Sequence, residues 1–453
     1  MKFVVIGGGV GGLGAAYELV RAGHEVAVYE AGDVLGGQVR TFEIGGGRIE
    51  IFYHHLFRSD TVVTALIEEL GLGADLEWIE SKVAFQAGGT IYPFISAMDL
   101  LRFTPVSLLT RIRLGLAALW LRRQSNWQQY EGMRAKDWIL RAVGREGYEA
   151  VWGPLLRAKF GRHADDVSMV WFWGKIYLRF ASRPGGLLAK EKLGYLRGSF
   201  GRLVDALGAA LLRRGATVET RRPAEAILTE GDGVTGVRVT GVRLAARADG
   251  SGAGEVIPAD AVIATVTSQQ FKALVPGLDA GYAALLDRVE YQWATVLVLA
   301  LDRPLSSTYW LTVTDADCPF VVAVEQTNFR SPAEYGGQHV VYFSNYTDPG
   351  DPIVNEDVEQ VLARYEPYIK RINPAFDRAW LLGSWLFKDR AGQPIVHSRY
   401  HEVIPPLATP TRGLYLANTT QIYPEDRGQN YAIRLGQRVA QLAMSELAPP
   451  DVH

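Results

Sequence analysis

Short apolar runs and helix-spaced apolar stripes take turns along the first part of the chain. Lys2 to Ile6 is a β-branched apolar run that predicts a buried parallel strand. Residues 13–20 follow with the spacing of a helix, and the run from His24 to Tyr29 predicts a second strand. This order of strand, helix and strand indicates an α/β fold.

Segments with similar patterns recur far along the chain. A helix is predicted from Leu203 to Arg214 and a strand from Asp260 to Thr265, and residues 412–418 form another apolar run. Residues 86–192 have a mostly helical pattern, whereas residues 271–404 contain alternating strand patterns. With 453 residues, the chain is long enough for two domains or for one domain built from non-contiguous segments.

A glycine-rich loop joins the first strand to the first helix and has the pattern G-x-G-x-x-G. Its first glycine allows the tight turn, its second lets the backbone approach a pyrophosphate, and its third lets the helix pack against the sheet. The free N–H groups and the dipole at the start of the helix favour phosphate. The predicted phosphate contacts come from Gly7, Gly9, Val10, Gly11 and Gly12.

The second strand ends at Glu30, about twenty residues after the glycines, where a carboxylate can accept hydrogen bonds from both hydroxyls of a ribose. The motif predicts a Rossmann-type dinucleotide site without separating FAD from NAD. The residues that follow resemble the extended signature of the flavin amine oxidase superfamily, in which a Gly-Gly loop lies beside the diphosphate and the flavin. Gln38 stands where that family often has Arg, so this phosphate contact is either weakened or supplied by Arg40. The resemblance implies FAD contacts from Ala31, Gly36, Gly37, Gln38, Arg40 and Thr41.

Residues 412–418 resemble the last strand of the same FAD-binding domain, in which the following helix points its N-terminus at the flavin. Asn418 occupies the position of the family's Asp and can still hydrogen-bond a ribityl hydroxyl, while Asn430 and Tyr431 begin the helix. By the same resemblance the backbone of Ala224 would touch the adenine. Cys318 lies away from this C-terminal motif, so the resemblance implies FAD that is bound non-covalently.

The resemblance also implies how the chain is divided. A Rossmann-type FAD-binding domain, discontinuous in sequence, is expected from residues 1–85, 193–270 and 405–450. A substrate-binding α+β domain is expected from residues 86–192 and 271–404, with a helical part and an antiparallel sheet.

Two segments indicate which reaction of this superfamily the protein catalyses. Monoamine-oxidase-type enzymes usually place a lysine at the start of a substrate-domain strand, but the matching residues 292–298 contain none. Residues 385–394 resemble protoporphyrinogen oxidases and phytoene desaturases, which pass a hydride from carbon beside a conjugated system to flavin N5. We therefore expect an FAD-dependent oxidoreductase of this group that acts on a small organic molecule.

A histidine pair supports an alternative function. Residues 53–60 are similar to a histidine segment of UDP-galactopyranose mutase, a non-redox flavoenzyme, with His55 in the place of its first histidine and His54 beside the flavin. The mutase needs arginines for the diphosphate of a nucleotide sugar, for which the candidates are Arg157, Arg179, Arg183 and Arg330. A flavin-binding protein without turnover is a third hypothesis.

The candidate catalytic residues are His55 and Arg427, which just precedes the last helix. The shape and lining of the pocket distinguish the three hypotheses. A pocket lined by arginines would favour the mutase, an apolar tunnel would favour the oxidoreductase, and a blocked pocket would favour a protein without turnover.

Composition and charge narrow the range of partners. The net charge of −2 argues against a general nucleic-acid binder, and one cysteine can form neither an intramolecular disulfide nor a zinc–thiolate cluster. No leader-like or membrane-spanning segment is visible, which favours a cytoplasmic location. Residues 114–121, flanked by arginines, predict a helix that packs on its own domain, with peripheral membrane contact as the alternative. The oligomeric state stays open.

Overall fold

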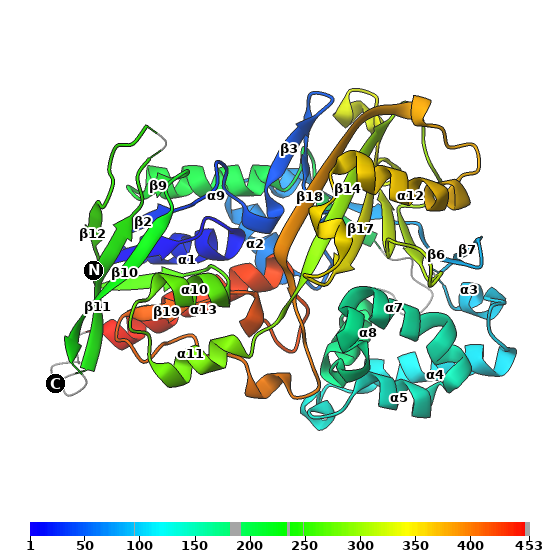
Figure 1. Cartoon of the computed structure of the whole chain (residues 1–453), viewed down its shortest axis with the longest axis horizontal. Helices are drawn as coiled ribbons and strands as arrows, with labels where there is room; N and C mark the ends of the chain where they lie inside the picture. The colour runs from blue at the N-terminus through cyan, green and yellow to red at the C-terminus, as the bar shows by residue number, and fades with distance from the viewer. Residues whose placement is uncertain (95, 182–191, 233–235, 248, 449–453) are drawn as a thin grey trace.

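The computed structural model describes residues 1–94, 96–181, 192–232, 236–247 and 249–448. Figure 1 shows a parallel sheet with its helices on the left, and a large antiparallel sheet with a group of helices on the right. Segments from the beginning, the middle and the end of the chain meet in the left-hand part.

The parallel sheet contains strands that are far apart in the sequence. Its order is β19 (Leu414–Leu416), β13 (Ala261–Ala264), β1 (Lys2–Ile6), β2 (Glu25–Tyr29) and β9 (Thr217–Glu219), and every pair is parallel. Helices α1 (Val10–Arg21), α9 (Gly201–Arg213) and α13 (Gln429–Leu447) cover one face, where α1 packs against both of the others. The predicted α/β class with a Rossmann-type sheet is confirmed.

The other face of this sheet has its own cover and its own core. Strands β10 (Ala224–Asp232), β11 (Gly236–Leu244) and β12 (Val256–Pro258) pack there with α10 (Ser268–Leu274) and α11 (Ala280–Asp287). Alternate side chains of β1 enter the two cores, Phe3 and Val5 on the helical side and Val4 and Ile6 on the other. The part of β1 that is buried on both faces, Phe3 to Ile6, is therefore apolar at every position, as its sequence predicts.

A seven-stranded sheet makes up the right-hand part of Figure 1. Its order is β18 (Leu381–Pro394), β14 (Tyr291–Leu301), β17 (His339–Thr347), β16 (Val322–Glu325), β15 (Trp310–Val313), β6 (Val83–Ala87) and β7 (Thr90–Pro93). Only the β15–β6 pair is parallel. Helix α12 (Val358–Ile372) packs on this sheet. Four of its side chains are buried in one core together with side chains of the strands, namely Val361, Leu362, Tyr365 and Ile369.

The helical part lies below this sheet in Figure 1. It contains α3 (Ala97–Arg102), α4 (Leu108–Arg123), α5 (Ala135–Ala142), α6 (Arg145–Gly147), a π-helix (Tyr148–Trp152), α7 (Gly153–Phe160) and α8 (Met169–Ala181). Three smaller elements complete the fold: the pair of β3 (Thr41–Ile44) and β4 (Gly47–Glu50), the pair of β5 (Leu76–Glu80) and β8 (Lys192–Leu196), and helix α2 (Thr61–Glu69).

The predicted division into two domains stays a prediction. Two of its boundaries, at residues 85 and 270, fall inside elements of the fold, namely β6 and α10. Strand β6 pairs with β15 and β7 in the seven-stranded sheet.

Candidate functional site

The glycine loop between β1 and α1 forms an open cradle. The first hydrogen bond inside α1 runs from the Leu13 N–H to the Gly9 carbonyl at 2.9 Å, so the N–H groups of residues 10–12 have no partner within the helix. A Cβ at Gly12 would lie 2.1 Å from the Gly7 carbonyl oxygen, which restricts this position to glycine. A Cβ at Gly9 would meet nothing closer than 3.8 Å, so that side of the loop is open to a ligand.

The Gly-Gly pair after Glu30 packs directly on this loop. The Gly36 N–H donates to the Gly8 carbonyl at 2.8 Å, and a Cβ at Gly37 would lie 3.0 Å from the Gly9 Cα. Both residues of the pair have positive φ angles, +114° at Gly36 and +58° at Gly37, a region that glycine adopts without steric cost. Two motifs that are separate in the sequence thus form the two sides of one cradle.

The Glu30 carboxylate joins the glycine loop after β1 to the loop that follows β2. It accepts hydrogen bonds from the Gly8 N–H at 2.7 Å and from the Gly32 N–H at 2.6 Å. Each carboxylate oxygen can accept more than one hydrogen bond, so the predicted contacts to a ribose diol are compatible with this arrangement.

A cavity of about 1820 Å³ runs from the cradle to the helical part. Pockets for single small molecules usually enclose about 300–1,000 Å³, so this one has room for a dinucleotide and a second molecule. Every predicted cofactor or catalytic residue lines this cavity except Thr41. Thr41 begins β3, and its hydroxyl accepts a hydrogen bond from Arg48 Nε at 3.1 Å.

Three of the lining side chains are hydrogen-bonded within the protein. Asn418 donates to the Val266 carbonyl at 2.9 Å and accepts from the Thr420 N–H at 2.9 Å. Asn430 accepts from two N–H groups at the start of α2, at 2.9 and 3.1 Å. Gln38, at the family's arginine position, donates to Asp389 at 3.0 Å and so ties its loop to β18. Their predicted contacts with FAD remain predictions.

The two histidines differ in their surroundings. His54 Nδ1 lies 2.6 Å from the Phe52 carbonyl, so this nitrogen carries the proton and Nε2 is left as an acceptor. Burial lowers the pKa of His54 to about 4, which keeps the ring neutral at physiological pH. His55 Nδ1 lies 3.1 Å from the Tyr309 hydroxyl, and its ring is edge-on to Trp310.

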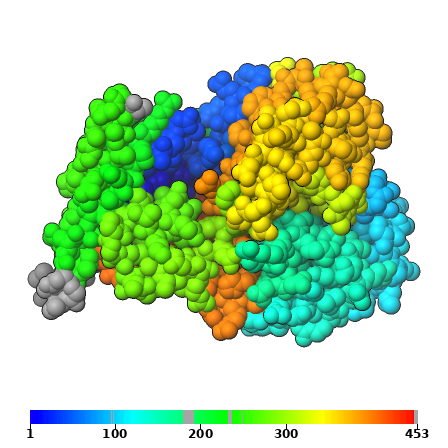
Figure 2. All heavy atoms as spheres, viewed as in Figure 1, coloured from blue at the N-terminus to red at the C-terminus, as the bar shows by residue number. Residues whose placement is uncertain are grey.

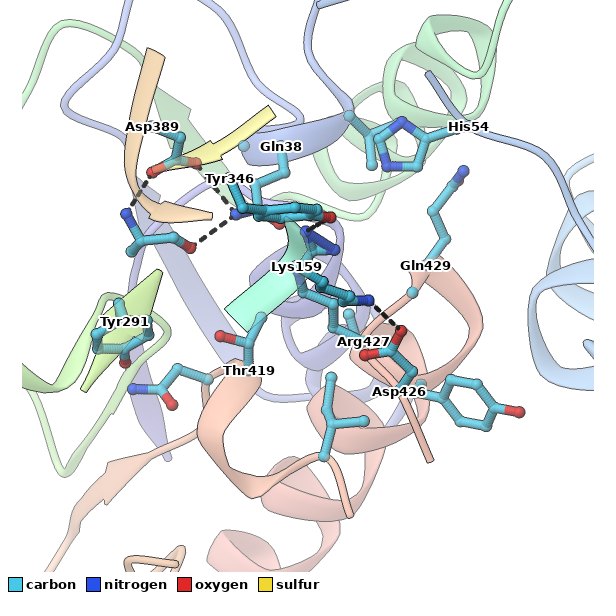
Figure 3. Close-up of a pocket in the computed structure, with 18 of the residues that line it drawn as sticks. Gln38, His54, Lys159, Tyr291, Tyr346, Asp389, Thr419, Asp426, Arg427 and Gln429 are labelled. Atoms are coloured by element: carbon cyan, nitrogen blue, oxygen red, sulfur yellow. Dashed lines mark hydrogen bonds and ion pairs between the residues drawn. The ribbon is translucent and has the colours of Figure 1, made fainter. Parts of the chain in front are cut away.

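The strongest charges of the site surround Asp426 (Figure 3). Lys159 Nζ, from α7, lies 3.2 Å from one carboxylate oxygen, and Lys175, from α8, pairs with the same oxygen. Trp171 Nε1 donates to the other oxygen at 3.3 Å. The neighbouring Arg427 donates to the Gly392 carbonyl and, at 3.0 Å, to the Tyr346 hydroxyl. Lys159, Lys175, Asp426 and Arg427 are called the Asp426 cluster below.

Opposing effects set the protonation of this cluster. Burial raises the pKa of Asp426, but Lys159, Lys175 and Arg427 together outweigh it and hold the pKa well below its usual range. Burial also lowers the pKa of Lys159 well below that of an ordinary lysine, against the attraction of Asp426. Lys159 therefore gives up a proton more readily than a lysine in water.

Sequence reasoning found Arg427 but missed both lysines. The family resemblance points to a lysine only on the strand at residues 292–298, whereas the two lysines reach the cavity from helices α7 and α8. The only signal was the charged loop before α13, which contains Asp426. No sequence spacing relates this loop to residues 159 and 175.

The start of α13 meets the same cavity, and its residues fit a flavin. The first hydrogen bond of the helix joins the Ala432 N–H to the Gly428 carbonyl, so the N–H groups of residues 429–431 are free of helical partners. The amide of Gln429 is buried in the cavity wall with no hydrogen-bond partner on its nitrogen or its oxygen. A heterocycle with alternating donors and acceptors at its edge would satisfy such an amide.

Two kinds of site are not found in the described part of the chain. These residues contain no group of histidine, cysteine and acidic side chains arranged to hold a metal ion. They also contain no helix with the length and apolar character needed to cross a membrane.

Comparison with known proteins places these features in a family. The model of the flavin-containing amine oxidoreductases matches residues 10–444. A protein named as a probable zeta-carotene desaturase from Synechococcus elongatus is 26% identical over 446 residues, which cover 86% of this chain and 89% of that protein. A protein named as a flavin-containing monoamine oxidase from Mycobacterium tuberculosis is also 26% identical, but the match spans only 37% of this chain and 38% of that protein.

Solved structures share the fold at low sequence identity. Cyclohexylamine oxidase from Brevibacterium oxydans has a TM-score of 0.71 at 15% identity, covering 98% of this chain and 99% of the other. Reduced UDP-galactopyranose mutase has a TM-score of 0.73 at 16% identity, covering 99% of this chain and 96% of the other. These structures confirm the fold, and the family match over residues 10–444 confirms the predicted flavin cofactor and oxidoreductase class. The chain belongs to the family of flavin-containing amine oxidoreductases.

Proposed function

We propose that this protein dehydrogenates an apolar organic substrate, as the oxidase and desaturase branch of the family does. The observation that supports this is the lining of the cavity beyond the cradle. There the wall consists of apolar side chains from β6, the segment after β7, the helices α4 and α7 and the π-helix: Phe85, Phe94, Leu114, Leu119, Trp152 and Leu155. An apolar wall binds an apolar molecule by removing its surface from water.

The residues of this chain supply binding and proton transfer. The glycine cradle and Glu30 hold the dinucleotide, and the N-terminus of α13 with Gln429 faces the cavity where the flavin ring would bind. Bound FAD supplies the acceptor for the hydride that leaves the substrate carbon. Dehydrogenation releases a proton as well, and we assign its acceptance to Lys159 Nζ, which lies in the cavity wall beside Asp426.

The charge of the wall disfavours a protonated amine as substrate. Around Asp426, three cationic side chains face one carboxylate, and even with Lys159 deprotonated two cations remain. A substrate ammonium group would be repelled there, whereas a neutral hydrocarbon or an anionic group would not. This supports the desaturase-like branch over amine oxidation.

The mutase alternative has weaker support. A diphosphate needs arginines in the pocket, and of the candidates Arg157 and Arg330 are absent from the cavity lining. Arginines at other positions do line it, but Arg162 pairs with Glu290, and Arg427 donates to the Gly392 carbonyl and the Tyr346 hydroxyl. Arg330 is occupied by ion pairs with Glu77 and Glu334. Arg183 and the side chain of Arg179 lie outside the described residues. The size of the cavity argues against the third hypothesis, a protein without turnover.

The test is anaerobic flavin bleaching by a panel of substrates. The purified protein, loaded with FAD, is mixed with a conjugated polyene in detergent, with putrescine and cyclohexylamine, and with UDP-galactopyranose. We expect loss of the oxidised flavin absorbance with the polyene and none with the amines. Bleaching by amines alone would refute the proposal, and sugar conversion by the reduced enzyme without net oxidation would establish the mutase reaction instead.

A further inference from the structure

Exposed apolar side chains gather on helices α3 and α4. Twelve large apolar residues of the described chain are exposed, and seven of them fall between residues 98 and 120. They are Met98, Leu101, Leu108, Leu109, Ile112, Leu116 and Trp120. Such a concentration on one pair of adjacent helices marks an interaction surface, because isolated exposed apolar residues are normally scattered.

The exposed residues of α4 form one stripe. At about 100° per residue, Leu109, Ile112, Leu116 and Trp120 fall within an arc of roughly 80°. Leu109 and Leu116 are 67% and 61% exposed, so this stripe faces solvent rather than the protein. Helix α4, which contains residues 114–121 and is expected from its sequence to pack on its own domain, therefore packs there with only one of its faces.

The opposite face of α4 lines the cavity. Leu114, Gly115, Ala118 and Leu119 belong to the cavity wall, together with Leu100 of α3. A single layer of helix thus separates the exposed stripe from the apolar end of the cavity. Helices α3 and α4 lie at the right-hand side of Figure 1, away from the parallel sheet, and the same segments contribute to the outer surface in Figure 2.

The charges near the stripe indicate what kind of surface it binds. Residues 97–123 contain five arginines and one acidic residue, Asp99, and α4 itself has four arginines and no acid. A symmetric dimer through this face would bring the arginines of two copies together, which like-charge repulsion opposes. The exposed arginines are Arg102, at the end of α3, and Arg122 and Arg123, at the end of α4 beyond Trp120. An apolar stripe with exposed arginines next to its ends matches instead a bilayer with anionic headgroups.

We propose that the α3–α4 face docks on the surface of an anionic lipid bilayer, and that an apolar substrate passes from the bilayer into the cavity beneath it. Docking stands independently of the reaction, whereas the passage of substrate rests on the proposed function. The helices would lie in the interface without spanning it, with the apolar stripe among the acyl chains and the arginines at the level of the phosphates.

Vesicle sedimentation tests the docking without any substrate. The FAD-loaded full chain is mixed with vesicles of phosphatidylcholine containing phosphatidylserine, or of phosphatidylcholine alone, at low and high salt. We expect binding that requires phosphatidylserine and weakens with salt. Leu116→Asp should reduce the partition coefficient by more than about tenfold, and Arg122→Gln and Arg123→Gln by about fivefold each.

Leu212→Asp is the matched control, because Leu212 is 58% exposed on α9, remote from this face. It should bind vesicles as the unaltered chain does, and equal flavin content and melting temperature show that the variants are folded. Wild-type protein that remains in the supernatant with anionic vesicles overturns the docking. Loss of binding that is equal in Leu116→Asp and Leu212→Asp also overturns it, as does a dimer that Leu116→Asp dissociates without any lipid binding.

A second measurement separates docking from substrate passage. The rate of flavin bleaching is compared for a polyene dissolved in anionic vesicles and for the same polyene in detergent. Slower bleaching by Leu116→Asp with vesicles, at an unchanged rate in detergent, supports passage from the bilayer. Normal docking without bleaching in either medium refutes the proposed function and leaves the docking intact.

Discussion

Replacing Asp426 by asparagine tests whether the buried charges around it stabilise one another. The side chains of Asp426 and Lys159 are each only 18% exposed, so water screens their interaction weakly. Asparagine keeps the shape of the residue but removes the negative charge, which leaves Lys159, Lys175 and Arg427 without a counter-charge. Removing one partner of a buried ion pair costs about 3–5 kcal/mol, and we expect the free energy of unfolding to fall by that amount.

Urea denaturation of the FAD-loaded protein at several pH values measures this effect. The pKa of Lys159 is already lowered in the folded state and should fall further in Asp426→Asn. The folded variant then binds fewer protons than the unfolded chain, so its stability should rise as pH increases toward the ordinary pKa of lysine. Adding Lys159→Met to the variant removes one unpaired cation and should restore part of the loss.

Asp165→Asn is the matched control for the same chemical change at the surface. Asp165 is 69% exposed and pairs with Lys136 at 2.7 Å, so its replacement should cost less than about 1 kcal/mol. If Asp426→Asn and Asp165→Asn lose equally little stability, the cluster is not held together as its geometry indicates, and the assignment of Lys159 loses its physical basis.

Three further variants test the cradle and two other residues of the fold. Gly37→Ala, which combines a positive φ angle with a Cβ 3.0 Å from Gly9, should lose FAD on dialysis, whereas Gly23→Ala, with a similar φ and open space, should lose only about 1 kcal/mol of stability and keep its FAD. Burial raises the pKa of Glu50 to about 7 from an ordinary 4.5, so the free energy of unfolding should fall by roughly 3 kcal/mol as pH rises from 4.5 to 7, and Glu50→Gln should abolish this dependence in denaturation curves. The lowered pKa of His54 acts in the opposite direction, since its contribution is lost as pH falls from 6.5 toward 4; His54→Asn should therefore be more acid-stable than the unaltered chain, and equal acid stability would contradict the burial of a neutral ring.

The sequence by itself determined the nucleotide-binding half of this protein. The run from Phe3 to Ile6 must be part of a strand buried on both faces, because every one of these four side chains needs an apolar neighbour. The glycines are equally local in origin, since the positive φ angles of Gly7, Gly36 and Gly37 disfavour residues with a side chain, and the Gly7 carbonyl leaves no room for a Cβ at Gly12. This is why so many of the predicted cofactor residues line one cavity.

Only the tertiary structure decided what lines the rest of the cavity. Lys159, Lys175 and Asp426 come from two helices and a distant loop, and no periodicity along the chain relates them. The two faces of α4 have similar apolar composition, so the sequence does not distinguish the face that lines the cavity from the face that meets solvent. Local rules act on neighbouring residues and on the backbone. The Asp426 cluster and the exposed surface depend instead on which distant elements pack together, and the local sequence pattern does not determine that.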